Sequence, residues 1–105
     1  MTTVEGVAIV SNMKAELLMN ERVILSKRAF VEITIWKLTK RLEGSAHLYK
    51  YRLAHVVDEI CVLRFDNEAG KGDHKHLNEI EVPYQFTDLD RLQTDFWAEV
   101  NNRRT

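Results

Sequence analysis

The chain has 105 residues, of which 45% are hydrophobic and 30% are charged, and its formal net charge is −1 at pH 7. This length and composition fit one folded domain and exclude a disordered chain, and the small net charge excludes a nucleic-acid binder that depends on an overall positive field. The single cysteine, Cys61, excludes an internal disulfide framework, and no apolar run approaches the ~20 residues that a membrane span requires.

The first patterned segment begins after Met13. Residues 1–12 are expected to form an N-terminal tail, and residues 13–105 a single α+β domain. Residues 14–19 and 22–26 have the composition of two short strands, and Asn20-Glu21 between them is typical of a hairpin turn. We therefore expect the domain to open with a β-hairpin.

Three further segments have the alternation that is typical of strands. Residues 29–38 alternate β-branched and polar side chains with a period of two. Residues 48–57 and 60–66 form the clearest predicted hairpin, with its turn at Asp58-Glu59. These segments predict a central antiparallel sheet.

The register of this hairpin decides which side chains share a face. A two-residue turn would place Arg52 opposite Phe65 on one side of the sheet and Tyr51 opposite Asp66 on the other. A shift of one residue would exchange the two faces.

The C-terminal part predicts an edge strand followed by a helix. Residues 80–82 form a short strand that Pro83 ends, as is common at a sheet edge. Thr87 is the predicted N-cap of an amphipathic helix over residues 88–102. Its apolar stripe consists of Leu89, Leu92, Phe96 and Val100. The predicted fold is α+β: an antiparallel meander sheet of five to six strands with the C-terminal helix packed on one face.

The polar segment over residues 66–76, predicted as a loop, has the highest density of reactive side chains. It contains two of the four glycines and two of the four histidines, and histidine titrates near neutral pH. His74 and His76 are predicted to be an acid–base pair for phosphodiester cleavage, with Asp66 or Asp73 orienting one imidazole.

The same segment allows a metal-binding interpretation. Asp66, Asp73, His74 and His76 have suitable ligand atoms, but the sequence identifies no third fixed ligand, so we assign no metal or other cofactor. Residues 70–73 lack the spacing of a nucleotide-binding phosphate loop. His47 and His55 have no comparable neighbourhood, and Trp36 and Trp97 are assigned to the core or to a partner surface.

A set of cationic and polar side chains is predicted to bind a polyanionic substrate. Arginine forks match phosphate oxygens, and the tyrosines that alternate with the cations resemble an aromatic, basic face for single-stranded nucleic acid. The predicted substrate-binding residues are Lys50, Arg52, Arg64, Lys71 and Asn67. The simpler alternative is a solvated sheet face, which is common on antiparallel sheets.

Several motifs together resemble the TumE family of toxin–antitoxin toxins. They are Tyr49-Lys50-Tyr51-Arg52-Leu53, Val62-Leu63-Arg64, the segment from Asp66 to His76, Pro83-Tyr84 and Asp95-Phe96-Trp97. The resemblance extends from about Met13 to the final helix. It implies a cytoplasmic bacterial protein that is encoded beside a helix-turn-helix antitoxin and silenced by it.

Three hypotheses for function follow. The first is a toxin that acts on RNA as a metal-independent endoribonuclease, using the loop histidines and the basic patch. The second is a non-catalytic module that binds protein or nucleic acid, and the third is a metal-dependent nuclease. No membrane partner is expected, and a homodimer is left open.

Overall fold

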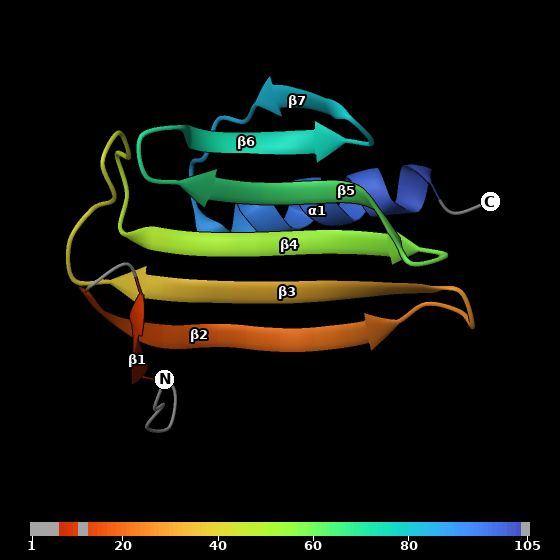
Figure 1. Cartoon of the computed structure of the whole chain (residues 1–105), viewed down its shortest axis with the longest axis horizontal. Helices are drawn as coiled ribbons and strands as arrows, with labels where there is room; N and C mark the ends of the chain where they lie inside the picture. Colours follow the sequence, from red (N-terminus) through yellow and green to blue (C-terminus); the bar gives the residue numbers. More distant parts are fainter. Residues whose placement is uncertain (1–6, 11–12, 104–105) are drawn as a thin grey trace.

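The structure, a computed structural model, describes residues 7–10 and 13–103. Seven strands follow one another in one antiparallel sheet, and a helix lies across one face of it (Figure 1). The elements are β1 (Val7–Val10), β2 (Met13–Ile24), β3 (Ala29–Leu38), β4 (Tyr49–Val57), β5 (Ile60–Glu68), β6 (Gly72–Leu77), β7 (Ile80–Pro83) and α1 (Leu89–Asn102). The predicted α+β meander with a C-terminal helix is confirmed. The sheet has one strand more than the largest number predicted. β1 lies in the segment assigned to a tail and β6 in the segment assigned to a loop, while the two strands predicted over residues 14–19 and 22–26 are the single strand β2.

The predicted hairpin at Asn20-Glu21 is wrong. β2 continues through both residues, which pair with Thr34 and Ile33 of β3, and only a bulge between Leu17 and Met19 interrupts the register. Asn20 and Glu21 are exposed, so their polarity reflects a solvent-facing outer strand and not a turn.

The turn between β4 and β5 is confirmed, but the predicted register is wrong. Asp58 and Glu59 have φ values of 51° and 68°, the left-handed conformation that a two-residue hairpin turn requires. A bulge then shifts the pairing by one residue, so that Arg52 and not Tyr51 pairs with Asp66. The two faces are exchanged, as expected for a shift of one residue.

The hydrophobic core lies between the sheet and α1. It includes Ile33, Leu53 and Phe65 from neighbouring strands, which the buried helix stripe covers. Three residues of the predicted stripe, Leu92, Phe96 and Val100, are fully buried, and Leu89 at its start is half-buried and packs against the core. Asp88 and not Thr87 is the N-cap, and its carboxylate accepts a hydrogen bond from the Arg91 backbone N–H at 2.7 Å. α1, the helix in the described part of the chain, is not long and apolar enough to cross a membrane.

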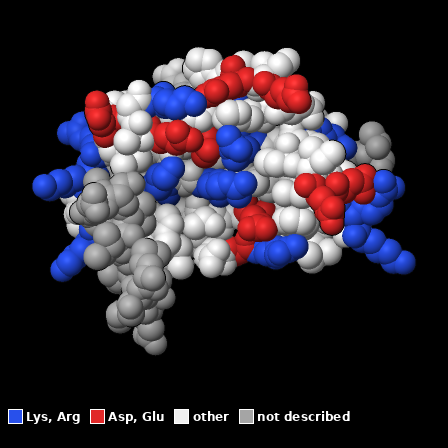
Figure 2. Space-filling view, viewed as in Figure 1, with Lys and Arg blue, Asp and Glu red and all other residues white. Residues whose placement is uncertain are grey.

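We call the other side of the sheet the open face, because α1 does not cover it. Side chains alternate along each strand, so the neighbours of the core residues point to this face. It carries Thr34 and Trp36 of β3, Lys50 and Arg52 of β4, Arg64 and Asp66 of β5, His74 and His76 of β6, and Glu81 of β7. Figure 2 looks onto this face and shows Lys and Arg side chains gathered near its middle, with acidic side chains beside them.

Candidate functional site

The polar segment predicted as a loop is a β-hairpin. β5 continues to Glu68, and β6 begins at Gly72 after a short turn. Gly70 and Gly72 have φ values of 82° and 76°, which explains the two glycines, because other residues adopt this conformation only with strain. The hairpin register pairs Asp66 with His74 and therefore places a carboxylate beside an imidazole.

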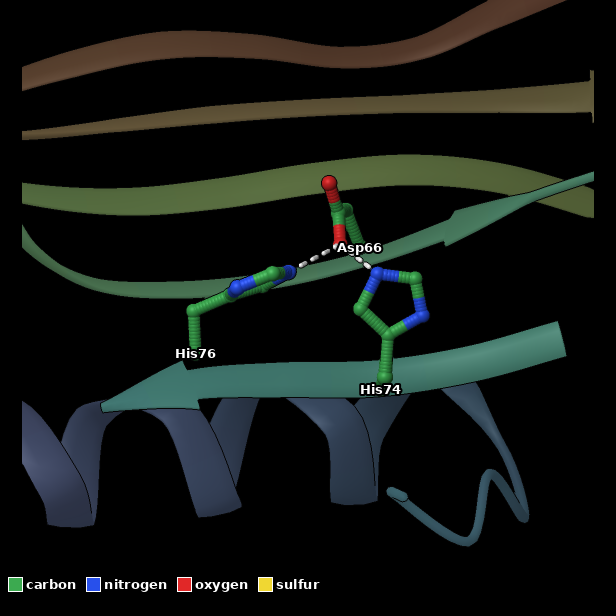
Figure 3. A group of neighbouring side chains, drawn as sticks. All are labelled: Asp66, His74 and His76. Atoms are coloured by element: carbon green, nitrogen blue, oxygen red, sulfur yellow. Dashed lines mark ion pairs between the residues drawn. The ribbon is translucent and has the colours of Figure 1, made fainter. Parts of the chain in front are cut away.

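Asp66, His74 and His76 meet on the open face, and we call them the Asp–His cluster. Both imidazoles project from β6 toward the Asp66 carboxylate on β5 (Figure 3). Nε2 of His74 lies 2.8 Å from Oδ1 of Asp66, and Nε2 of His76 lies 3.9 Å from the same oxygen. Arg64 forms an ion pair with the other carboxylate oxygen of Asp66, since its Nε lies 2.9 Å from Oδ2. The predicted grouping of Asp66 with both histidines thus has a geometric basis.

The neighbours of each imidazole indicate where its proton lies. Nδ1 of His74 is 3.2 Å from the Gly72 carbonyl oxygen, which can only accept, so Nδ1 donates. Nε2 of His76 is 2.9 Å from Nη2 of Arg64, which can only donate, so this nitrogen accepts. Nε2 of His76 therefore carries no proton, as a general base requires, but its lone pair accepts from Arg64, which must move away before this nitrogen can take a proton.

Glu81 of β7 is a member of the site that the sequence did not predict. Its Oε1 lies 3.5 Å from Nε2 of His74 and 3.2 Å from Nζ of Lys71. The hydrogen bond from Lys71 lowers the pKa of Glu81 below its ordinary value. A proton on Nε2 of His74 would thus lie between two carboxylates, those of Asp66 and Glu81.

The predicted cations have different surroundings. Arg52 pairs with Asp66 in the sheet and is exposed, and its guanidinium has no ion-pair partner within the described residues. The Lys50 ammonium donates a hydrogen bond to the Asn67 carbonyl oxygen. Arg52 and Arg64 are therefore the cations next to the Asp–His cluster, while Lys71 reaches its margin through Glu81.

Asp73 lies on the opposite face, because it is adjacent to His74 in a strand. Its Oδ2 is 2.7 Å from Nε2 of His47 and accepts a hydrogen bond from the Tyr51 hydroxyl at 2.6 Å. The Tyr49 backbone N–H donates to Nδ1 of His47, so Nε2 of His47 is the nitrogen that donates to Asp73. The structure therefore does not bring Asp73 to the Asp–His cluster. Asp73 instead forms a second network with His47 and Tyr51, although the sequence predicted no functional neighbours for His47.

The Asn67 side chain also forms its hydrogen bonds away from the Asp–His cluster. Its side chain is buried and bridges to β4: Oδ1 accepts from the Tyr51 N–H at 3.0 Å, and Nδ2 donates to the Tyr49 carbonyl oxygen at 2.7 Å. These bonds continue the β4–β5 connection beyond the last paired residues. The Asn67 side chain is therefore buried between the strands and connects them, away from a substrate on the surface.

The Asp73 network predicts a specific acid sensitivity. Burial acts to raise the pKa of Asp73, but the hydrogen bonds from His47 and Tyr51 outweigh it, so the pKa lies below the ordinary 3.8. The stability from this carboxylate is fully present above about pH 4 and is lost as the pH falls through the lowered value. Urea denaturation of Asp73→Asn between about pH 7 and pH 3 should therefore show a weaker loss of stability on acidification than the wild type. Identical pH profiles would contradict this role.

Comparison with known proteins identifies a family. The family model described as Toxin TumE matches residues 9–104. No curated protein and no solved structure matches the chain. The matched region includes β2 to β7 and α1, and with them the whole Asp–His cluster.

Proposed function

The chain belongs to the TumE toxin family, and from this premise we propose that it is a toxin that cleaves RNA with the Asp–His cluster. The observation that carries the proposal is the convergence of two imidazoles, a carboxylate and an arginine on an uncovered sheet face. These are the groups that acid–base cleavage of a phosphodiester uses. We further propose a helix-turn-helix antitoxin as its partner.

In the proposed reaction, the RNA supplies its own nucleophile. When the phosphate binds, Arg64 turns from Nε2 of His76 to a phosphate oxygen. His76 then takes the proton of a ribose 2′-hydroxyl, whose oxygen attacks the adjacent phosphorus, and Nε2 of His74 gives its proton to the leaving 5′-oxygen. The P–O5′ bond breaks, which leaves a 2′,3′-cyclic phosphate and a 5′-hydroxyl. Arg64 and Arg52 stabilise the charge on the phosphorane oxygens, the Gly72 carbonyl oxygen orients the His74 ring through Nδ1, and the Asp66 carboxylate stabilises the proton on Nε2 until it is given up. The test is to incubate purified protein with single-stranded RNA and with DNA of the same sequence, of which only the RNA should be cut.

The two imidazoles differ in accessibility. The side chain of His76 is 21% exposed and that of His74 only 4%. Lys71 and Glu81, which lie beside His74, are long side chains that are 52% and 40% exposed and can move when a phosphate binds. Catalytic contacts often reach their final geometry only in the substrate complex, so the burial of His74 is compatible with its proposed role.

The arginines of the open face predict a salt dependence. Each phosphate contact with single-stranded RNA contributes about 0.7 to the slope of log affinity against log salt concentration. Arg52→Ala should reduce that slope by about one contact, because Arg52 is exposed and has no competing ion-pair partner among the described residues. Lys27→Ala, which removes an exposed cation near the β2–β3 turn, is the matched control. An equal slope for Arg52→Ala and the wild type would argue against phosphate binding by Arg52.

A metal-dependent nuclease is the second candidate, and one observation favours it. Ligand atoms of Asp66, His74 and His76 lie within 4.8 Å of one another. Oδ1 of Asp66 and Nε2 of His74 are buried and make no well-aligned hydrogen bond in the described structure. The Gly72 carbonyl oxygen that accepts from His74 is also typical of the partners that orient a metal-bound histidine.

We prefer the metal-free reaction because Arg64 already supplies the positive charge at this position. Its guanidinium contacts both Asp66 and His76, so it would repel a cation bound to these residues. Excess chelator separates the two candidates. RNA that binds but stays intact would instead favour a non-catalytic binding module.

A further inference from the structure

A cavity of about 270 Å³ lies beside the Asp–His cluster on the open face. Its lining residues are Thr34, Trp36, Lys50, Tyr51 and Arg52. Arg52 lies between the cavity and the Asp–His cluster, because it pairs with Thr34 on one side and with Asp66 on the other. The cavity is smaller than the pockets that hold drug-sized ligands, and its size suits one planar group.

Trp36 gives the cavity an aromatic wall. The residue packs against the small apolar cluster of Ala15, Leu38 and Leu42, yet it is only half-buried. No stacking partner for its ring is found among the residues that the structure describes. An indole that lines a cavity on a polar face can therefore accept a planar ligand without displacing a ring of the described residues.

Cations complete the surroundings of the cavity. Trp36 pairs with Lys50 in the sheet, and Thr34 pairs with Arg52. An aromatic platform beside basic side chains is the combination that binds single-stranded nucleic acid, where the ring stacks on a base and the cations follow the phosphates. The base must be unstacked from its neighbours to reach such a platform, which a duplex does not allow.

We propose that this cavity is a nucleobase subsite for single-stranded RNA, with Trp36 stacking on a base next to the scissile phosphate. Arg52 binds the phosphate between the subsite and the cluster. This inference rests on the proposed RNA cleavage and names the form of RNA that the toxin takes. Because stacking reads no base edge, the subsite is expected to accept different bases.

A short 2′-O-methyl oligoribonucleotide tests the subsite apart from catalysis, because it binds but has no nucleophilic 2′-hydroxyl. In Trp97→Phe protein, Trp36 is the remaining one of the two tryptophans. Its fluorescence should be quenched on titration with this oligonucleotide. Trp36→Ala should weaken binding about fivefold to 150-fold, equivalent to 1–3 kcal/mol per stacked base, while Trp36→Phe keeps most of the affinity.

The outcomes separate the subsite from the reaction. Unchanged Trp36 fluorescence together with unchanged affinity of folded Trp36→Ala would overturn the subsite, even if RNA is cleaved. Quenching and weaker binding without RNA cleavage would support the subsite and contradict the nuclease. No binding at low salt by the wild type would overturn both. If Trp36→Ala does not fold, the fluorescence of Trp97→Phe protein alone tests the subsite. Quenching by the oligonucleotide would support the subsite, and a lack of quenching would contradict it.

Discussion

Replacing His74 or His76 with alanine is expected to lower the rate of RNA cleavage by roughly 10²–10⁴, the usual contribution of a general acid or base. His76 is the proposed base because its Nε2 accepts from Arg64, and His74 is the proposed acid because its Nε2 faces two carboxylates. Initial rates with a labelled RNA measure the effect, and growth after induced expression measures toxicity. Both variants should also lose growth arrest.

Lys75→Ala is the matched control for these two variants. Lys75 lies between the histidines in sequence but points to the other face, where its Nζ is 3.0 Å from a Glu99 carboxylate oxygen. Its replacement should leave cleavage unchanged. Full growth arrest by a folded protein that lacks both imidazoles would remove the acid–base proposal.

Phe96→Ala is expected to lower the free energy of unfolding by roughly 3–5 kcal/mol, a large share of the stability of a small domain. Phe96 is fully buried, and its ring packs edge-on against Phe65 at a centroid distance of 5.6 Å. The substitution would leave a cavity where α1 meets the sheet. Urea denaturation measures the loss, and Thr94→Ala on the exposed side of α1 should change stability by less than about 0.5 kcal/mol. A similarly small change for Phe96→Ala would contradict the assignment of α1 to the core.

The sequence predicts the elements of this fold better than their register. Period-two alternation identifies β3 with both of its ends, and the helical stripe identifies α1, because in each case one side of the element is buried. The bulge between β4 and β5 has no signal in the pattern, since it depends on how an extra residue is accommodated between paired strands. The resulting shift moves Arg52, and not Tyr51, to the face of Asp66.

Only part of the candidate site could be predicted, because the site also depends on register and on strand alternation. Asp66, His74 and His76 were grouped by closeness in sequence, and the hairpin register does bring them together. Asp73 was included by the same criterion, but strand alternation directs it away from His74. Glu81 is contributed by the neighbouring strand β7, where it pairs with His76, and sequence distance gives no indication of that contact.

Cleavage of single-stranded RNA in the presence of excess chelator tests most directly whether the imidazoles of the Asp–His cluster perform the reaction. The expected result is cleavage by the wild type at an unchanged rate, with 2′,3′-cyclic phosphate ends, and no cleavage by the variant that lacks His74 and His76. Loss of cleavage with chelator and its recovery on addition of a divalent transition metal would contradict the metal-free reaction. Intact RNA after incubation with folded, growth-arresting protein would contradict RNA cleavage itself.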